Sequence, residues 1–187
     1  MNYALGLTFS NQQKLLSTFN TETTIETGEI LNEESNSAKD IVMPQSIGIG
    51  LAIEIPDRLT AALDYTLQDW SENTFYTSTA DFKTSQSIRF GLEYKPVRSF
   101  RKNYLNFIDY RIGAFYSDLY YQIYGIPIIE KGVSVGLGLP FRTTKIDLSL
   151  EYGIKGTTQN NLVEENYFKL KVGLLLKQQW FQKRKFY

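Results

Sequence analysis

The sequence contains no cysteine and no histidine among its 187 residues. Without cysteine it has no disulfide framework, no thiolate zinc site and no thiol nucleophile. Without histidine it lacks the usual imidazole ligand for metals and the general base of serine and cysteine hydrolases. We therefore expect no catalytic residue, no metal site and no cofactor, and we expect that the protein is not an enzyme.

An excess of charge of one sign is also missing, because 20 basic and 20 acidic residues give a formal net charge of zero. A balanced chain has no general attraction for phosphate, so we expect no nucleic-acid partner. No stretch approaches the roughly 18 consecutive apolar residues of a membrane helix. The segment from Met1 to Phe9 has neither the basic start nor the continuous apolar block of a secretory signal.

The sequence is instead rich in aromatic residues, with 13 Tyr and 12 Phe, and it alternates strictly between apolar and polar positions. From Ser46 to Ile55 the odd positions are apolar and the even positions are mostly small or polar. This period of two is typical of a β-strand with one apolar face. The following Pro56-Asp57-Arg58 predicts a tight turn.

The same alternation recurs along the chain and predicts nine strands and no helix. The strands are expected at residues 3–10, 14–26, 46–55, 59–68, 87–95, 108–117, 133–139, 146–155 and 168–177. Short turns alternate with long polar loops, such as residues 11–13 and 27–45. This asymmetry is typical of an up-and-down outer-membrane barrel with short periplasmic turns and long extracellular loops.

Alternation by itself also fits a soluble antiparallel barrel or sandwich, whose apolar face points inward. Three features favour lipid: strands of about ten residues, a polar face rich in small residues, and aromatic residues near strand ends. These aromatic residues are Trp70, Phe75, Tyr76, Tyr94, Tyr104, Phe107, Tyr120, Tyr121, Tyr167, Trp180 and Phe181. We therefore predict an all-β protein, an antiparallel up-and-down transmembrane β-barrel in the bacterial outer membrane, in contact with membrane lipid.

The expected topology indicates that N-terminal strands are missing. Nine strands would place Met1 on the long-loop side, whereas a barrel chain enters from the periplasm, and bacterial barrels have even strand numbers. An open sheet would also leave two unpaired edges, which lipid does not tolerate. We expect residues 1–187 to be one barrel domain that lacks its N-terminal strands.

Charged residues on the polar face are expected to line the lumen. They are Asp64, Arg89, Glu93, Asp109, Arg111, Asp147, Glu151, Lys169 and Lys171. Neighbouring strands should place the charges of 89–93 beside those of 109–111, and the acids of 147–151 beside the lysines of 169–171. The pattern predicts a structural charge network, with the alternative that Arg89 and Arg111 bind the carboxylate of a ligand.

Two segments near the ends of the chain carry further expectations. The acidic residues 29–40 are expected to form a solvated loop rather than a cation site. The basic and aromatic end, Lys183 to Tyr187, is expected to complete the last strand, because a terminal aromatic resembles the signal read by the barrel-assembly machinery.

Several short motifs resemble one known family. They are MPQSIGIG at 43–50, AALDY at 61–65, QDWS at 68–71, YRIGAFY at 110–116, GVSVGLGLP at 132–140, LEYG at 150–153, EENYFK at 164–169 and WFQKRK at 180–185. In this order they resemble the C-terminal part of FadL-like outer-membrane proteins, in the form carried by Bacteroidetes-type bacteria. The resemblance covers about residues 43–187.

This resemblance implies the C-terminal portion of a barrel of about 14 strands, an even number as in other bacterial barrels. It further implies uptake of hydrophobic small molecules such as long-chain fatty acids. The family's N-terminal hatch has no counterpart here, so its ligand residues cannot be placed on this sequence. The alternative is an accessory or structural barrel within a secretion or assembly complex, which predicts stable protein partners and no hydrophobic ligand.

Overall fold

A computed structural model describes residues 1–15, 19–24, 30–36, 41–71, 80–97, 103–141 and 144–176. Most of these residues lie in β-strands, and the two short 3-10 helices are η1 (Tyr104–Phe107) and η2 (Gln159–Asn161). Within the described ranges, no helix is long and apolar enough to cross a membrane.

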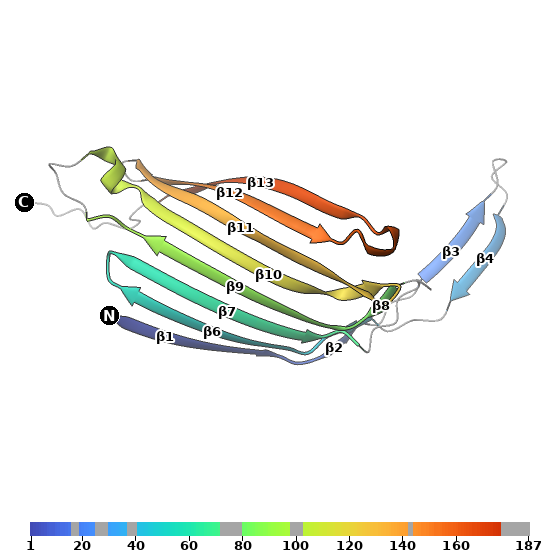
Figure 1. Ribbon diagram of the computed structural model, residues 1–187. Coiled ribbons are helices and arrows are strands. Elements are labelled where there is room, and N and C mark those ends of the chain that lie inside the picture. Colours follow the sequence, from blue (N-terminus) through green and yellow to red (C-terminus); the bar gives the residue numbers. More distant parts are fainter. Residues whose placement is uncertain are drawn as a thin grey trace, which may run out of the picture.

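The main sheet contains nine strands, of which eight form one continuous path. In path order they are β1 (Asn2–Ser10), β6 (Ser46–Ile55), β7 (Leu59–Asp69), β9 (Thr84–Tyr94), β10 (Asp109–Ile123), β11 (Ile126–Phe141), β12 (Thr144–Gly156) and β13 (Glu164–Leu176). The ninth, β8 (Ala80–Phe82), pairs with the end of β10. Every pairing is antiparallel, and strands adjacent in the path follow one another along the chain (Figure 1). The predicted all-β, up-and-down sheet is confirmed.

The described parts of residues 14–26, which are 14–15 and 19–24, do not belong to the main sheet, contrary to the strand that alternation predicted. The register of the β1–β6 ladder, where Ser10 pairs with Ser46, continues unchanged into the ladder of β2 (Gln13–Leu15) and β5 (Ile41–Met43). β3 (Phe19–Thr24) and β4 (Ile30–Asn36) extend it further, beyond the end of the main sheet in Figure 1. The turn predicted at residues 11–13 is wrong, because the polar residues there interrupt the alternation without reversing the chain.

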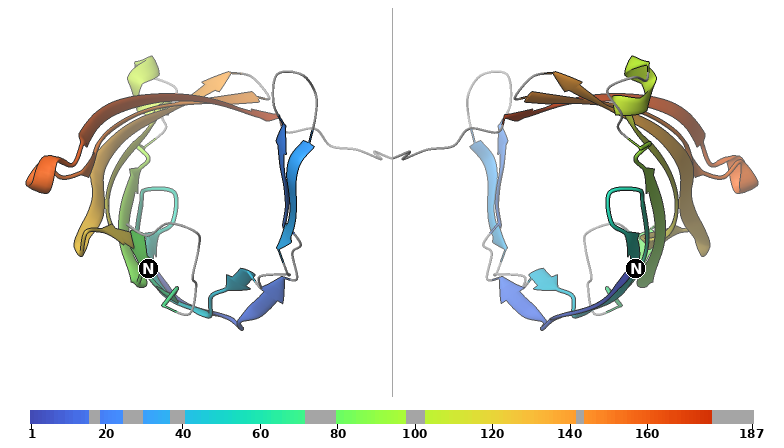
Figure 2. Two further views of the ribbon diagram at one scale, coloured as in Figure 1. Left: turned by 90° about the vertical axis from the view of Figure 1, so that its right-hand side faces the viewer. Right: turned by 90° about the vertical axis from the view of Figure 1, so that its left-hand side faces the viewer.

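The main sheet curves into an open gutter rather than a closed cylinder. Figure 2, viewed along the sheet, shows β1 at one edge of the curve and β13 at the other. No ladder joins β1 to β13 in the part of the chain that the structure describes, so each has one free edge there. The predicted closure of the sheet into a barrel is therefore not seen in these residues.

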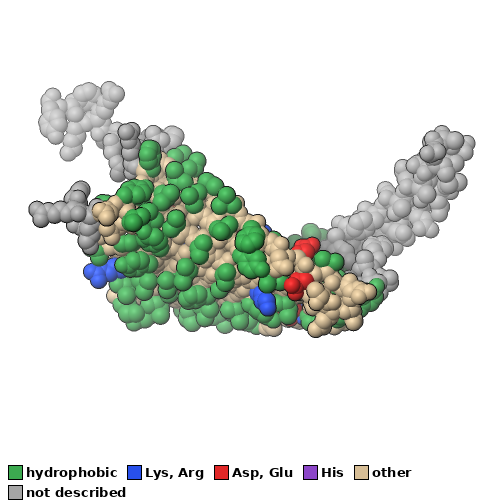
Figure 3. Space-filling model, turned by 45° about the horizontal axis from the view of Figure 1, so that its top comes forward, with side chains coloured by type: hydrophobic (Ala, Val, Ile, Leu, Met, Phe, Trp, Pro, Cys, Tyr) green, Lys and Arg blue, Asp and Glu red, His purple; other side chains and the backbone are tan. Residues whose placement is uncertain are grey.

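Curvature decides which way the apolar face points. The outer, convex side of the gutter is the side seen in Figure 3, where hydrophobic side chains gather over the strands. Small and charged residues alternate with them and point to the concave side: a Cβ added to Gly50 would lie 2.6 Å from Asp64 Oδ1. This is the arrangement of a barrel with a polar interior, and it is the reverse of a soluble barrel.

The convex face is not covered by any second layer among the described residues. Among the described residues, only two apolar side chains are buried, Ile108 at 6% and Ile128 at 5% relative exposure. A chain of this size normally buries about 70% of the surface that its unfolded form exposes. The free energy that stabilises this sheet must therefore come in large part from whatever contacts the convex face.

Aromatic residues lie at both ends of the strands, as predicted. At one end the Tyr120 ring lies 4.7 Å from Trp70, 5.9 Å from Phe82 and 5.2 Å from Tyr121. At the other end Tyr94 closes β9, and η1 carries Tyr104 and Phe107.

Five predicted features involve residues outside the described ranges. Four of the predicted aromatic residues belong here: Phe75, Tyr76, Trp180 and Phe181. The basic end of the chain, residues 183–187, is the fifth. The acidic segment 29–40 is described only at residues 30–36, which form β4 rather than the predicted loop.

The hairpin that joins β10 to β11 depends on a glycine. Ile123 pairs with Ile126, and between them Tyr124 and Gly125 have φ angles of 52° and 74°. Two successive residues of positive φ form the tight turn that matches the twist of paired strands. We predict that Gly125→Ala lowers the free energy of unfolding by about 1 kcal/mol, because a Cβ is strained at this φ.

Urea unfolding in detergent micelles, followed by tryptophan fluorescence, measures this change. Gly91→Ala is the matched control, since neither glycine has another atom within 4 Å of an added Cβ and only Gly125 has a positive φ. Equal stability of the two variants would contradict the prediction.

Candidate functional site

The concave face carries a group of six charged side chains that we call the charge network. Its members are Glu93, Lys95, Asp109, Arg111, Lys145 and Asp147. Three are acidic and three are basic, so the formal charges cancel. They come from the ends of β9, β10 and β12 that lie near η1, and β11 runs between the second and third of these strands.

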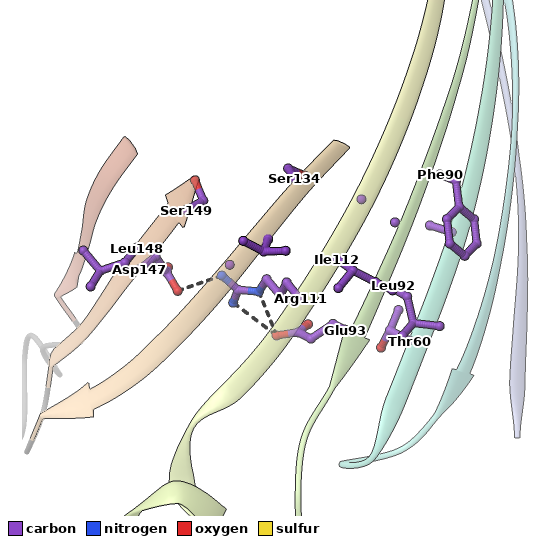
Figure 4. A pocket seen from close by; sticks show the side chains of 15 residues that line it. Thr60, Phe90, Leu92, Glu93, Arg111, Ile112, Ser134, Asp147, Leu148 and Ser149 are labelled. Carbon is purple, nitrogen blue, oxygen red and sulfur yellow. Dashed lines mark hydrogen bonds and ion pairs between the residues drawn. The ribbon is translucent and has the colours of Figure 1, made fainter. Parts of the chain in front are cut away.

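Arg111 is the centre of the charge network. Its Nε and Nη2 atoms donate to Glu93 Oε1 at 3.2 and 3.1 Å, and Nη1 donates to Asp147 Oδ1 at 2.7 Å (Figure 4). Glu93 lies directly opposite Arg111 in the β9–β10 ladder, whereas Asp147 is two strands away on β12. One guanidinium therefore connects three of the four strands from β9 to β12, with short charge-assisted bonds.

Lys145 lies close to all three acids of the network. Its Nζ lies 2.6 Å from Asp109 Oδ2, 3.8 Å from Asp147 Oδ1 and 4.0 Å from Glu93 Oε1. The Asp109 side chain is only 4% exposed and forms a close ion pair with this ammonium. Lys95 adds a longer contact of 3.5 Å to Glu93.

Two glycines of β11 make room for these contacts. Gly136 lies opposite both Arg111 and Ser149, and Gly138 lies opposite both Asp109 and Asp147. A Cβ on Gly138 would lie 2.9 Å from Lys145 Nζ, and one on Gly136 would lie 3.4 Å from Arg111 Cβ. Both glycines lie within a strand, as predicted, and their lack of a side chain lets the charged side chains cross β11.

An open groove of about 480 Å³ borders the charge network on the concave face. Thr60, Ser134 and Ser149 line it together with Arg111. Because Arg111 already uses three of its five N–H groups on carboxylates of this chain, the arrangement is suited to holding strands in register. The predicted binding of a ligand carboxylate by Arg111 stays a prediction.

A second cluster lies on the outermost strands. Glu151 Oε1 lies 3.4 Å from Lys169 Nζ, and Glu151 Oε2 lies 2.8 Å from Lys171 Nζ. Tyr167 donates its hydroxyl to Glu130 at 2.5 Å, and Lys169 Nζ lies 4.2 Å from the centre of the Tyr167 ring. The expected neighbourhood of Glu151 and the two lysines is confirmed, whereas Asp147 belongs to the charge network instead.

Arg89 is not placed beside residues 109–111. The register puts it opposite Asp64 on β7 and opposite Phe115 on β10. The predicted pairing of the 89–93 segment with 109–111 is thus correct for Glu93 and Arg111 and wrong for Arg89. The reason is that β9 and β10 are antiparallel. Because Glu93 lies opposite Arg111, Arg89, four residues earlier on β9, lies opposite a residue four positions later on β10, which is Phe115. Ligand binding by Arg89 stays a prediction.

Sequence reasoning missed Lys145 and Lys95 as members of the network. Lys145 lies two residues before Asp147 and so shares its face, but the strand was expected to begin at residue 146. Lys95 shares the face of Glu93 and lies one residue beyond the end of β9. Lys95 already lay within the strand predicted at 87–95, on the face of Glu93, and the period of two would have found Lys145 if the next strand had been started one residue earlier.

A separate ion pair at the opposite end of the sheet was also missed. Lys83 Nζ lies 2.6 Å from Asp118 Oδ2, next to the aromatic group around Tyr120. Asp118 marks the place where the β10–β11 register shifts, and its other oxygen is buried without a hydrogen-bond partner among the described residues. A register shift of this kind gives no signal in the alternation of the sequence.

The family of the protein follows from the whole chain. The family model named BamG matches residues 1–187. The chain belongs to the BamG family. BamG is a family of the barrel-assembly machinery, and membership implies a bacterial protein associated with the outer membrane. No curated protein matches the chain.

Membership of the BamG family corrects the interpretation as a FadL-like transporter. The match extends over all 187 residues, whereas the FadL-like resemblance rested on loose motifs from residue 43 onward. Several of those motifs lie in strands with alternating apolar residues, such as GVSVGLGLP in β11, and other membrane barrels share that pattern. Uptake of fatty acids or other hydrophobic solutes is therefore not supported, and the role in an assembly complex is the better interpretation.

The charge network predicts different consequences for the two arginines of the concave face. We predict that Arg111→Met lowers the free energy of unfolding by about 1–2 kcal/mol, because it leaves Glu93 and Asp147 without their shared donor in a partly exposed site. Arg89→Met should change it by less than about 0.5 kcal/mol, as is usual for exposed positions. Urea unfolding in micelles measures both, and an equal effect of the two substitutions would contradict the role of Arg111.

Proposed function

We propose that this protein is a structural subunit of the outer-membrane barrel-assembly machinery, and that its sheet forms part of a transmembrane wall. The observation that carries the proposal is the apolar convex face of a single-layer sheet, in a chain that matches the BamG family over its whole length. Membership of the family supports a role in the assembly complex, and the apolar convex face supports a position of the sheet in the membrane.

Strand length and aromatic placement support contact with lipid. β10, β11, β12 and β13 contain 15, 16, 13 and 13 residues, more than the roughly 9–11 that a tilted strand needs to cross a bilayer. Aromatic residues at both ends of the strands fit the two membrane interfaces. Leu5, Val135 and Leu170 are 67%, 56% and 72% exposed, as expected of side chains that face lipid.

The interior of the gutter supports a structural role rather than a catalytic one. The six charges of the network are matched within the chain, and the chain carries no histidine or cysteine. Matched charges across a ladder stabilise register, whereas catalytic groups need an unsatisfied or strongly perturbed partner. We accordingly infer that the protein acts by binding other proteins and not by chemistry.

The proposal is tested by affinity purification of the chromosomally tagged protein from washed outer membranes in mild detergent. We expect the central subunit of the barrel-assembly machinery to elute with it in constant ratio across a sizing column. An unrelated outer-membrane barrel that carries the same tag is the control. Elution of the tagged protein without any assembly subunit, or recovery only in the soluble fraction, would refute the proposal.

Two adjacent residues of β11 test the orientation of the sheet. Val135 lies on the convex face and Ser134 on the concave face. We predict that Val135→Lys costs about 2–4 kcal/mol because a charge then faces the bilayer, whereas Ser134→Lys is tolerated in the polar interior. Heat-modifiable mobility on gels, together with the amount in the outer membrane, measures folding. Greater damage from Ser134→Lys would indicate a soluble barrel with its apolar face inward.

A further inference from the structure

The free edge of β13 is the most exposed part of the described sheet together with β1. Phe168, Leu170, Val172 and Leu174 are 63–72% exposed on the convex face, although they belong to a regular strand of 13 residues. The other edge of β13 is fully paired with β12, from Glu164 to Leu176. The free edge of β13 can therefore pair with a second strand, and none of the described residues pairs with it.

An unpaired strand edge is costly in a membrane. Each backbone N–H or C=O group without a partner costs several kcal/mol in hydrocarbon, so open sheet edges do not occur there. A second strand must therefore pair with the free edge of β13 over several residues. Its side chains must alternate so that the apolar ones lie on the convex face and the polar ones on the concave face.

The concave side of β13 adds a requirement of charge. Lys169 and Lys171 point there and are 50% and 61% exposed, and both contact the single carboxylate of Glu151. Two ammonium groups therefore share one acid on the β12 side. A strand on the free side of β13 would meet both lysines, so a carboxylate on its polar face would balance the second charge.

The other free edge of this chain lacks such a carboxylate. The residues of β1 that point to the concave side are Asn2, Ala4, Gly6, Thr8 and Ser10. None is acidic, so β1 would leave the second lysine of β13 without an acid, whether it came from the same molecule or from a second copy. Charge complementarity therefore argues against β1, the other free edge of the main sheet, as the neighbour of β13, and it is met by an acidic strand of another protein.

We propose that the free edge of β13 pairs with a strand of a partner outer-membrane protein that carries Asp or Glu on its polar face opposite Lys169 and Lys171. This inference rests on the proposed function, because it takes the sheet to be a membrane wall. It goes further in naming the edge, the chemistry of the partner strand and the two residues that select it.

The test places a photo-crosslinking phenylalanine analogue at Leu170 in the full-length protein in native outer membranes. Ile112 is the matched control, because it lies on the convex face at 53% exposure but has β9 and β11 paired on its two sides. We expect an adduct with a second protein from position 170 and none from position 112. The cross-linked peptide should alternate apolar residues and carry Asp or Glu within two residues of the link.

Charge variants separate pairing from simple proximity. Lys171→Glu should lower the yield of the adduct on the order of tenfold, since like charges then face each other, and Lys171→Arg should preserve it. Both variants should remain in the outer membrane fraction at the amount of the unaltered protein, because Lys171 is exposed and the mostly buried Glu151 keeps Lys169 as a partner.

Four results would overturn the inference. They are a cross-link to any segment of this chain, a cross-linked peptide without an acidic residue, an adduct that survives Lys171→Glu at full yield, and the absence of an adduct from position 170. If any occurs while assembly subunits still copurify, the inference fails and the proposed function stands. If no assembly subunit copurifies, the proposed function itself fails.

Discussion

The structure depends on one constraint: a single curved sheet has an apolar face with no partner layer among the described residues. Ordinary domains bury such a face against a helix or a second sheet. Here the apolar residues lie on the outside of the curve, and Ile108 and Ile128 are the only buried apolar side chains in the part of the chain that the structure describes. The main source of stability must therefore be the medium or the proteins around the sheet. The stability of the fold thus depends on where the protein is located and on what it binds.

The concave side carries charged residues instead of apolar ones, and these residues form ion pairs with one another. Arg111 on β10 binds Glu93, which lies directly opposite on β9, and Asp147, which lies beyond β11 on β12. It does so beside Gly136, where an added Cβ would already touch Arg111 Cβ at 3.4 Å, while an added Cβ on Gly138 would lie 2.9 Å from Lys145 Nζ. The small residues on this face thus leave the space in which the charged side chains meet.

The alternation of residues was sufficient to predict the antiparallel meander, the two faces and the pairing of Glu93 with Arg111. It was not sufficient for residues 14–26, since a strand that extends its neighbour and a strand that returns have the same period. It also missed Lys145, because one residue at a strand end decides whether a side chain is counted. The family was misjudged for a related reason: short alternating motifs are common to many membrane barrels, and the match over the whole chain decided for BamG.

The sequence by itself determined that the chain forms strands with one apolar and one polar face, since side chains alternate in any extended backbone. Only the tertiary structure decided that the apolar face is convex, because the direction in which a sheet bends depends on the packing of all its strands together. It also decided which charges meet, because register and crossing over glycine involve residues that are far apart in the sequence. The two free edges, β1 and β13, likewise emerge only when the strands are assembled.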